Sequence, residues 1–218
     1  MACLDLETGK ERWQARNPAP YQVHAAAVDF GKGPRATPAV SGGRVVTHGV
    51  SGVLSCLHAV TGKVLWRKDF IKELPRPAPV FGASSSPLVD GRLCIAHVGF
   101  WGKGKLASFD LETGAVQWSY EGDAPAYSSP ILVTLAGERQ VVTLGTDYLL
   151  GLSAITGKLL WRVRCYSDSL QNMVTAIVHK DLLIYGGYKA TPRAIRLERK
   201  EGTIMPREVW KAEGVPLY

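Results

Sequence analysis

The chain has 218 residues, of which 46% are hydrophobic and 21% are charged, a balance typical of a folded globular protein and unlike that of a disordered chain. Its net charge of +7 comes from 26 basic and 19 acidic residues that are interspersed without a Lys/Arg run, so a nucleic-acid-binding function is not expected. No apolar stretch approaches the roughly 20 residues that span a bilayer, so no transmembrane segment is predicted.

The first repeat unit begins in its middle, and residues 1–13 carry charges rather than the apolar core of a signal peptide. A signal peptide lost together with an upstream segment is left open, so the residues alone leave the localisation unknown. Further along the chain, short apolar runs separated by 23 Gly and 13 Pro predict many strands joined by tight turns.

One phrase recurs along the whole chain, with a Thr-Gly pair followed four residues after the Gly by Trp. A degraded fifth copy runs from Ala194 through Gly202 to Trp210, and the five tryptophans recur at intervals of 43 to 53 residues. These intervals suit a blade of four short strands. The four clear copies are Gly9 with Trp13, Gly62 with Trp66, Gly114 with Trp118, and Gly157 with Trp161.

A second phrase precedes the later Trp copies and supplies the other strands of each unit. A first strand is predicted around Pro38, Pro87 and Pro130, and a turn leads from it to a second strand such as 44–48. A third strand then enters the Thr-Gly turn, where Gly accepts a positive φ, and a fourth strand carries the Trp. The Trp offers a large apolar face that one small blade cannot cover, so it is expected to lie against the next blade.

The phrase resembles the tryptophan-docking motif A-x-D-x-x-T-G-K-x-x-W of the quinoprotein alcohol dehydrogenase-like, or PQQ-binding-like, β-propeller repeats. The first copy matches it best, whereas the third has Ala115 in place of Lys and the second and fourth replace the Asp with His58 and Ser153. The resemblance implies that each Trp packs on the Gly turn of a neighbouring blade. The motif argues against the WD and Kelch classes of propeller, because the WD dipeptide and the Kelch Tyr/Trp spacing are missing from this sequence.

The fold class expected is therefore all-β, a β-propeller of four-stranded antiparallel blades of which about four and a half are present. Propellers of this family usually close with seven or eight blades, so the chain is expected to be part of a longer propeller or to associate through open blade edges. A single domain, 1–218, is predicted to comprise a partial blade 1–18, blades at about 34–70, 82–122, 126–166 and 171–213, and the start of a further blade at 214–218.

The enzymes that the motif resembles bind pyrroloquinoline quinone and Ca²⁺ in a central channel, often beside an adjacent Cys-Cys disulfide. In this chain Cys3, Cys56, Cys94 and Cys165 lie far apart and are expected to be buried free thiols. The five histidines lack metal-site spacing, and His58 is expected to form a local turn hydrogen bond. No catalytic or metal-binding residue is assigned, and PQQ with Ca²⁺ rests on the resemblance alone.

A polar ring at one rim of the channel is the candidate binding site. Alignment on the strand-start prolines places four side chains at equivalent positions, Arg35, Ser84, Tyr127 and Asn172, with Thr37, Ser86 and Ser129 two residues beyond the first three. Arg35 offers a charged donor fork and Tyr127 an aromatic face. The alternative interpretation is that the hydroxyl groups only cap strand starts and bind water.

A second candidate surface is the glycine-rich segment 102–105, which is too short for a phosphate-binding loop and is predicted to be an exposed hairpin tip. Phe100 and Trp101 beside it are candidates for an aromatic contact with a partner. The primary functional hypothesis is a non-catalytic binding or scaffold propeller with a protein or small-ligand partner, like a related bacterial outer-membrane barrel-assembly lipoprotein. The alternative is part of a PQQ/Ca-dependent dehydrogenase; the resemblance implies a periplasmic or secreted location in either case.

Overall fold

The structure is a computed structural model, and it describes the chain except residues 17, 71–79, 101, 168–170 and 216–218. Its strands form one two-stranded sheet and four four-stranded antiparallel sheets. The predictions of an all-β propeller and of about four and a half blades are therefore confirmed. The 3-10 helix η1 (Ala25–Phe30), between the two-stranded sheet and the first full blade, was not predicted from the sequence.

The strands follow the chain in order. The half-blade consists of β1 (Ala2–Leu4) and β2 (Glu11–Gln14). The first full blade holds β3 (Ala39–Ser41), β4 (Arg44–His48), β5 (Val53–His58) and β6 (Val64–Asp69), and the second holds β7 (Leu88–Asp90), β8 (Leu93–Phe100), β9 (Lys103–Asp110) and β10 (Val116–Tyr120). The third holds β11 (Ile131–Leu135), β12 (Glu138–Leu144), β13 (Tyr148–Ser153) and β14 (Leu159–Arg164), and the fourth holds β15 (Ile177–His179), β16 (Leu182–Tyr185), β17 (Arg193–Lys200) and β18 (Thr203–Lys211).

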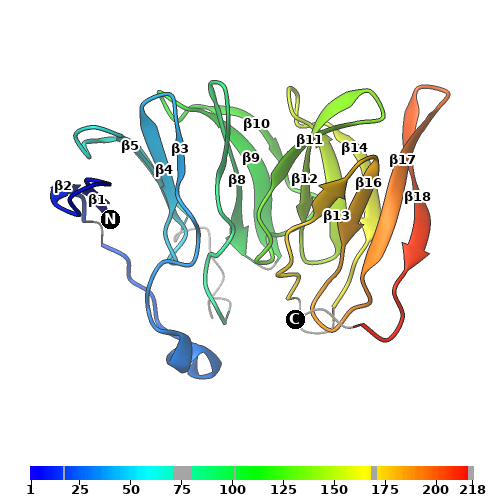
Figure 1. The fold of residues 1–218 in the computed structure, drawn as a ribbon, viewed down its shortest axis with the longest axis horizontal. Coiled ribbons are helices and arrows are strands. Elements are labelled where there is room, and N and C mark those ends of the chain that lie inside the picture. The colour runs from blue at the N-terminus through cyan, green and yellow to red at the C-terminus, as the bar shows by residue number, and fades with distance from the viewer. Residues whose placement is uncertain (17, 71–79, 101, 168–170, 216–218) are drawn as a thin grey trace.

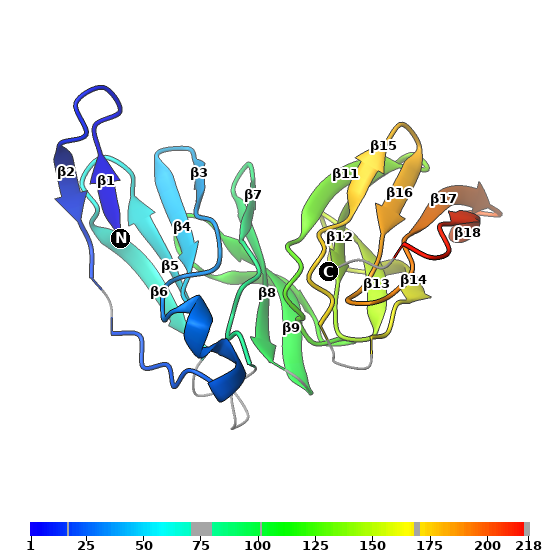
Figure 2. The same cartoon turned by 60° about the horizontal axis from the view of Figure 1, so that its bottom comes forward.

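The sheets stand side by side in a row, with the β1–β2 half-blade at one end and the β15–β18 blade at the other (Figures 1 and 2). The hairpins that join the first strand to the second and the third strand to the fourth point to one side, the top of Figure 1, whereas the hairpins between the second and third strands point to the opposite side. The connections from one blade to the next gather on the opposite side, where η1 also lies, and this side is called the loop face below (Figure 1). Thr-Gly turns and inter-blade loops therefore belong to opposite faces of the molecule.

Every described Trp of the repeat occupies the same place in its sheet, opposite a residue of the preceding strand and beside a β-bulge. The paired residues are Trp13 with Cys3, Trp66 with Cys56, Trp118 with Ser108, Trp161 with Gly151 and Trp210 with Ala194. Because side chains alternate between the two faces of a strand, this shared register turns all five indoles toward the same side of their sheets. That side faces the next blade.

The core lies between neighbouring sheets. In one layer Val46, Cys56 and Trp66 of the first full blade pack with Ala96 and Phe109 of the second. Equivalent apolar layers separate the second blade from the third and the third from the fourth. Each blade thus buries its apolar surface only against its neighbours, which is the packing of a repeat protein.

Two expectations about individual side chains need correction. Cys56, Cys94 and Cys165 are buried free thiols as expected, but Cys3 is only half-buried because it belongs to the half-blade. Phe100 is buried as well, so it is not available for the aromatic contact proposed beside the hairpin tip. Trp101, its suggested companion, lies outside the described residues.

Candidate functional site: inter-blade joints and the loop face

Three tryptophans lie directly on a Gly of the following blade. A methyl group added to Gly62, Gly114 or Gly157 would come within 2.5–2.8 Å of the ring of Trp13, Trp66 or Trp118, respectively. These glycines have φ values of +69°, +72° and +70°, where other residues are strained. Glycine therefore serves both the turn and the close approach of the indole.

The same three indoles donate a hydrogen bond to the turn on which they lie. Each N–H reaches the carbonyl three residues before the Gly: Trp13 to Ala59 at 2.8 Å, Trp66 to Leu111 at 2.9 Å and Trp118 to Ala154 at 3.3 Å. A buried indole N–H needs such a partner. The repeated pair of contacts, ring on Gly and N–H on carbonyl, defines what is called here a tryptophan seat.

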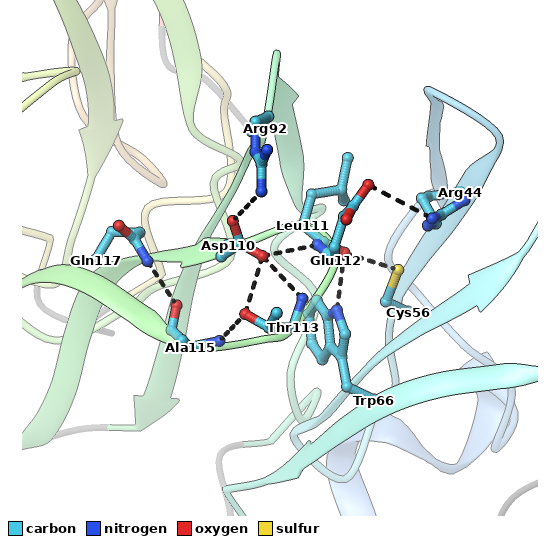
Figure 3. Close-up of polar contacts among 10 residues, drawn as sticks. All are labelled: Arg44, Cys56, Trp66, Arg92, Asp110, Leu111, Glu112, Thr113, Ala115 and Gln117. Atoms are coloured by element: carbon cyan, nitrogen blue, oxygen red, sulfur yellow. Dashed lines mark hydrogen bonds and ion pairs between the residues drawn. The ribbon is translucent and has the colours of Figure 1, made fainter.

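The seat of Trp66 shows how the turn is held rigid (Figure 3). One carboxylate oxygen of Asp110 accepts hydrogen bonds from the Thr113 backbone N–H at 2.8 Å, the Thr113 hydroxyl at 2.9 Å and the Glu112 N–H at 3.1 Å. These donors, with the Thr113 N–H foremost, lower the pKa of Asp110 below its ordinary value. In the second copy His58 takes the Asp position, and its Nδ1 lies 3.2 Å from the Thr61 hydroxyl, the local turn contact that was expected.

Trp161 departs from the pattern of the three preceding copies. Its N–H donates to the side-chain oxygen of Gln140 in its own blade, and its ring covers Gly151. Gly202, the turn glycine of the following blade, has no described atom within 4 Å of the position a Cβ would take. The joint is closed instead by Arg199, which donates to the Ala136 carbonyl at 3.1 Å and to the Glu138 carboxylate at 3.2 Å.

On the loop face, the structure brings three of the four predicted rim residues into contact with a residue that the sequence did not single out, Phe81. The Arg35 guanidinium lies 5.6 Å from the Phe81 ring centroid, and Tyr127 meets the same ring edge-on at 5.6 Å. The Ser84 hydroxyl donates to the Phe81 carbonyl at 3.3 Å. Phe30, at the end of η1, contacts the ring from another side at 5.7 Å, and burial raises the pKa of Tyr127 to about 12. We call Phe30, Arg35, Phe81 and Tyr127 the loop-face aromatic cluster.

Asn172 does not occupy the position predicted for it. Counted back from the first residues of the inner strands, the position of Arg35, Ser84 and Tyr127 is held in the fourth blade by Met173. Asn172 is fully buried, and its amide donates to the carbonyls of Gly145, Thr146 and Cys165 at 2.8–3.2 Å. The fourth blade lacks the strand-start Pro on which the alignment relied, so the alignment slipped by one residue.

The predicted hydroxyl ring links the blades in series. The Thr37 N–H donates to the Ser86 hydroxyl, the Ser86 N–H to the Ser129 hydroxyl and the Ser129 N–H to the hydroxyl of Thr175, at 2.9, 2.9 and 3.2 Å. Thr175 belongs to the same series but escaped the alignment for the reason that misplaced Asn172. These hydroxyls therefore join one blade to the next rather than only capping strand starts.

Buried titratable side chains form hydrogen bonds that attach the inter-blade connections to the blades. His48 Nδ1 lies 3.0 Å from the Ser85 carbonyl, and His97 Nε2 lies 3.2 Å from the Asp123 carbonyl. Burial lowers the pKa of both rings, that of His97 to about 4, so both are neutral near pH 7. The Asp123 carboxylate accepts from the Thr146 hydroxyl at 2.7 Å and from the Tyr148 N–H at 2.9 Å, and burial raises its pKa. The loops are thus bound to the blades on both sides.

Ca²⁺ accompanies the quinone cofactor in the enzymes that the repeat motif resembles. Ca²⁺ requires several converging oxygen ligands, but the best-buried carboxylate, Asp123, is already committed to backbone and hydroxyl donors. Among the residues that the structure describes, no three His, Cys, Asp or Glu side chains are grouped so that they could hold a metal ion. The described side chains therefore do not form a ready oxygen-ligand set for Ca²⁺.

Phe81 and Phe30 were missed because they belong to inter-blade connections rather than to the repeat. The connections around 19–36 and 70–83 are longer than the later ones, and this difference in length was the available signal. Neither connection carries a motif that predicts ring contacts, so the contact between Phe81 and Tyr127 could not be predicted from the sequence. Among the residues that the structure describes, no helix is long and apolar enough to cross a membrane.

Comparison with known proteins places this architecture in a family. A family model described as outer membrane protein assembly factor BamB matches residues 1–213. The chain therefore belongs to this family of PQQ-like repeat propellers, as the docking motif predicted. No curated protein sequence matches the chain.

Solved structures share the fold at low sequence identity. BamB from Moraxella catarrhalis is 18% identical with a TM-score of 0.72, and the match covers 98% of this chain and 58% of that one. A europium-containing methanol dehydrogenase has 15% identity, a TM-score of 0.63 and coverages of 94% and 47%. A quinohemoprotein alcohol dehydrogenase from Pseudomonas putida HK5 has 13% identity, a TM-score of 0.62 and coverages of 95% and 39%. This chain thus spans little more than half the length of the BamB structure and less than half of the two dehydrogenases.

Proposed function

We propose that this chain is a non-catalytic propeller segment that binds a protein partner through its loop face. The observation that carries the proposal is the loop-face aromatic cluster, in which rings packed edge to face and an arginine lie beside the exposed residues of η1. Aromatic residues and Arg dominate the energetic centres of protein interfaces. Phe30 and Val28 of η1 extend this surface, with 65% and 61% of their areas exposed.

The rigidity of the loops supports the same proposal. Tyr21 donates its hydroxyl to the Val80 carbonyl at 2.9 Å, and the His48, His97 and Asp123 contacts attach the neighbouring loops to the blades. A surface held in place before binding loses little conformational entropy when a partner arrives. The family description, an outer membrane protein assembly factor, favours a partner of that assembly and an envelope location.

Site-specific photo-cross-linking tests the protein-binding proposal. A benzophenone amino acid replaces Phe30 in one variant and the exposed Val60, on the opposite face, in the control. Cross-links from position 30 to an outer-membrane assembly protein, without the same product from position 60, are the expected result. Equal products from the two positions would show that the loop face is not the binding surface.

The second candidate function is that of a dehydrogenase portion, favoured by the likeness of the fold to a methanol dehydrogenase and a quinohemoprotein alcohol dehydrogenase. Calorimetric titration of the folded chain with PQQ and Ca²⁺, followed by dye reduction with alcohols or sugars, separates the two candidates. The scaffold proposal expects no saturable binding. Saturable binding together with dye reduction would overturn it.

A further inference from the structure

The outer strand of the third blade departs from the repeat in its charge. The residue three positions after the docking Trp is acidic in the other four-stranded blades and is Arg164 in the third. In the fourth blade this acid neutralises the base beside the Trp, because Glu213 forms an ion pair with Lys211 at 3.2 Å. The third blade carries two bases at the same positions, Arg162 and Arg164. The three acids are Asp69, Glu121 and Glu213.

Strand alternation places both arginines on one face of β14. Trp161 and Val163 pack in the apolar layer that joins the third blade to the fourth. Because side chains alternate along a strand, Arg162 and Arg164 lie on the opposite face, which is turned toward the second blade. Both arginines are exposed, so the face presents two positive charges to solvent.

Aromatic rings hold the two guanidinium groups in place. Arg162 lies 4.7 Å from the centroid of the Tyr148 ring, and Arg164 lies 5.6 Å from the same centroid. Arg164 also lies 5.5 Å from the centroid of Tyr166, a ring that is 47% exposed. Stacking engages the flat face of a guanidinium and leaves the N–H donors at its edge for an anion. The two arginines and Tyr148 are called the β14 patch below.

The donors of the β14 patch are largely uncommitted. Arg164 forms one ion pair, with Asp147 at 3.4 Å. Arg162 makes no ion pair or hydrogen bond with a described residue. Two stacked bases therefore face a single acid, and the patch keeps a net positive charge.

The backbone of β14 is open beside this patch. The strand is the last in the order of its sheet, so it pairs with β13 on one side and with no described strand on the other. Its six residues contain no Pro. Such an edge can accept an added strand from another protein. The outer strands of the other blades are open as well, so the two arginines are what distinguish β14.

We propose that β14 binds an extended acidic segment of a protein partner, with carboxylates at alternate positions facing Arg162 and Arg164. Alternate side chains of a strand share one face and lie about 7 Å apart, so the two arginines match acids spaced two residues apart in an added strand. Opposite charges at cross-strand positions stabilise the pairing of strands. The proposal rests on β14 and does not depend on the loop-face aromatic cluster.

Fluorescence anisotropy with two labelled peptides tests the spacing of the acids. Thr-Glu-Val-Glu-Val-Thr presents both carboxylates on one face of a strand, whereas Thr-Glu-Glu-Val-Val-Thr has the same composition with its carboxylates on opposite faces. The alternating peptide is expected to bind the full chain saturably and about tenfold more tightly than the other. Equal affinities, or binding of neither peptide, would overturn the proposal.

Charge reversal tests whether the arginines carry the binding. Arg162→Glu and Arg164→Glu are each expected to weaken the binding of the alternating peptide about tenfold, because an attractive cross-strand pair becomes a repulsive one. Lys63→Glu makes the same change in net charge at an exposed position of the first full blade, so it is the matched control and should bind like wild type. Circular dichroism melts check that the three variants are folded. A loss in Lys63→Glu equal to that in the arginine variants would show that the peptide responds to net charge alone, and the proposal would be wrong.

Phosphate-bearing ligands provide the remaining comparison, because a stacked guanidinium also fits a phosphate group. Inositol hexakisphosphate and phosphatidylglycerol vesicles are titrated into wild type and the two arginine variants. We expect neither ligand to distinguish the arginine variants from Lys63→Glu. Binding that only the arginine changes abolish, tighter than that of the alternating peptide, would assign the β14 patch to a phosphate group and overturn the proposal.

Discussion

The joint between the first and second full blades and the joint between the third and fourth use a Trp at the same register for different contacts. Trp66 lies on Gly114 of the next blade and donates to the Leu111 carbonyl. Trp161 lies on Gly151 and donates to Gln140, both in its own blade. In the fourth blade, β18 runs from Thr203 to Lys211 and the Gly-to-Trp distance grows, so the turn is carried away from the indole. The comparison teaches that a docking Trp requires a correctly spaced turn in its neighbour. When the turn moves, the apolar layer between the blades and the Arg199 contacts can replace the seat.

Among the changes that test this comparison, truncating a seated indole should lower the stability of the chain most. Trp66→Ala or Trp118→Ala is expected to lower the free energy of unfolding by about 3–5 kcal/mol, because each removes a buried ring from an inter-blade core. Trp210→Ala, which removes a partly exposed ring, is expected to cost less than about 1 kcal/mol in dilute solution. Urea titrations of the three variants check the order. Equal losses would mean that seating does not distinguish the rings.

Acid should weaken the joints that contain buried histidines. The pKa of His97 is about 4 in the folded chain and about 6.5 when unfolded, so the neutral ring is favoured by folding. This contribution is fully present above about pH 6.5 and falls progressively toward pH 4, by up to about 3 kcal/mol. The melting temperature should depend less on pH in His97→Gln than in wild type over this range. His179→Gln, which changes an exposed side chain, should show the same pH dependence as wild type. Between the third and fourth blades the corresponding loop contact is made by the Asn172 amide, which does not titrate.

Removing the replacement partner of Trp161 probes the unusual joint directly. Gln140→Leu keeps a side chain of similar size but leaves the buried Trp161 N–H without an acceptor, which is expected to cost about 1–3 kcal/mol. Gln117→Leu, at an exposed position, is the control and should change stability little. Chemical denaturation measures both. If Gln140→Leu leaves the free energy of unfolding unchanged, the indole N–H must find another acceptor, such as the turn of the next blade.

The smallest expected difference separates two glycines of the same motif. Gly9→Ala and Gly114→Ala both force a methyl group into a positive φ, at a cost of about 1–2 kcal/mol. Gly114→Ala also displaces the Trp66 ring, 2.8 Å from the added methyl, so it should cost at least about 1 kcal/mol more. Unfolding at a concentration where the chain is monomeric gives the difference. A smaller loss at Gly114 than at Gly9 would contradict the close packing of the seat.

Much of the candidate site was readable because it repeats. Arg35, Ser84 and Tyr127 were placed together by alignment on Pro38, Pro87 and Pro130, and they converge in the structure. Asn172 was misplaced by one residue because Ala176 stands where the other blades have Pro. Phe81, to which the other three are joined, lies in a connection with no repeat to align. Its contacts arise from the paths of two long loops, which local sequence does not specify.

The sequence by itself determined the propeller class and the spacing of Thr-Gly turns and tryptophans, because these depend on strand alternation and on the freedom of Gly at positive φ. Tertiary structure alone decided which indole meets which turn. Trp13, Trp66 and Trp118 are seated, Trp161 turns to Gln140, and Trp210 is left at an open face. The physical reason is that seating is a contact between two blades, and its energy depends on the relative position of both rather than on the motif of either.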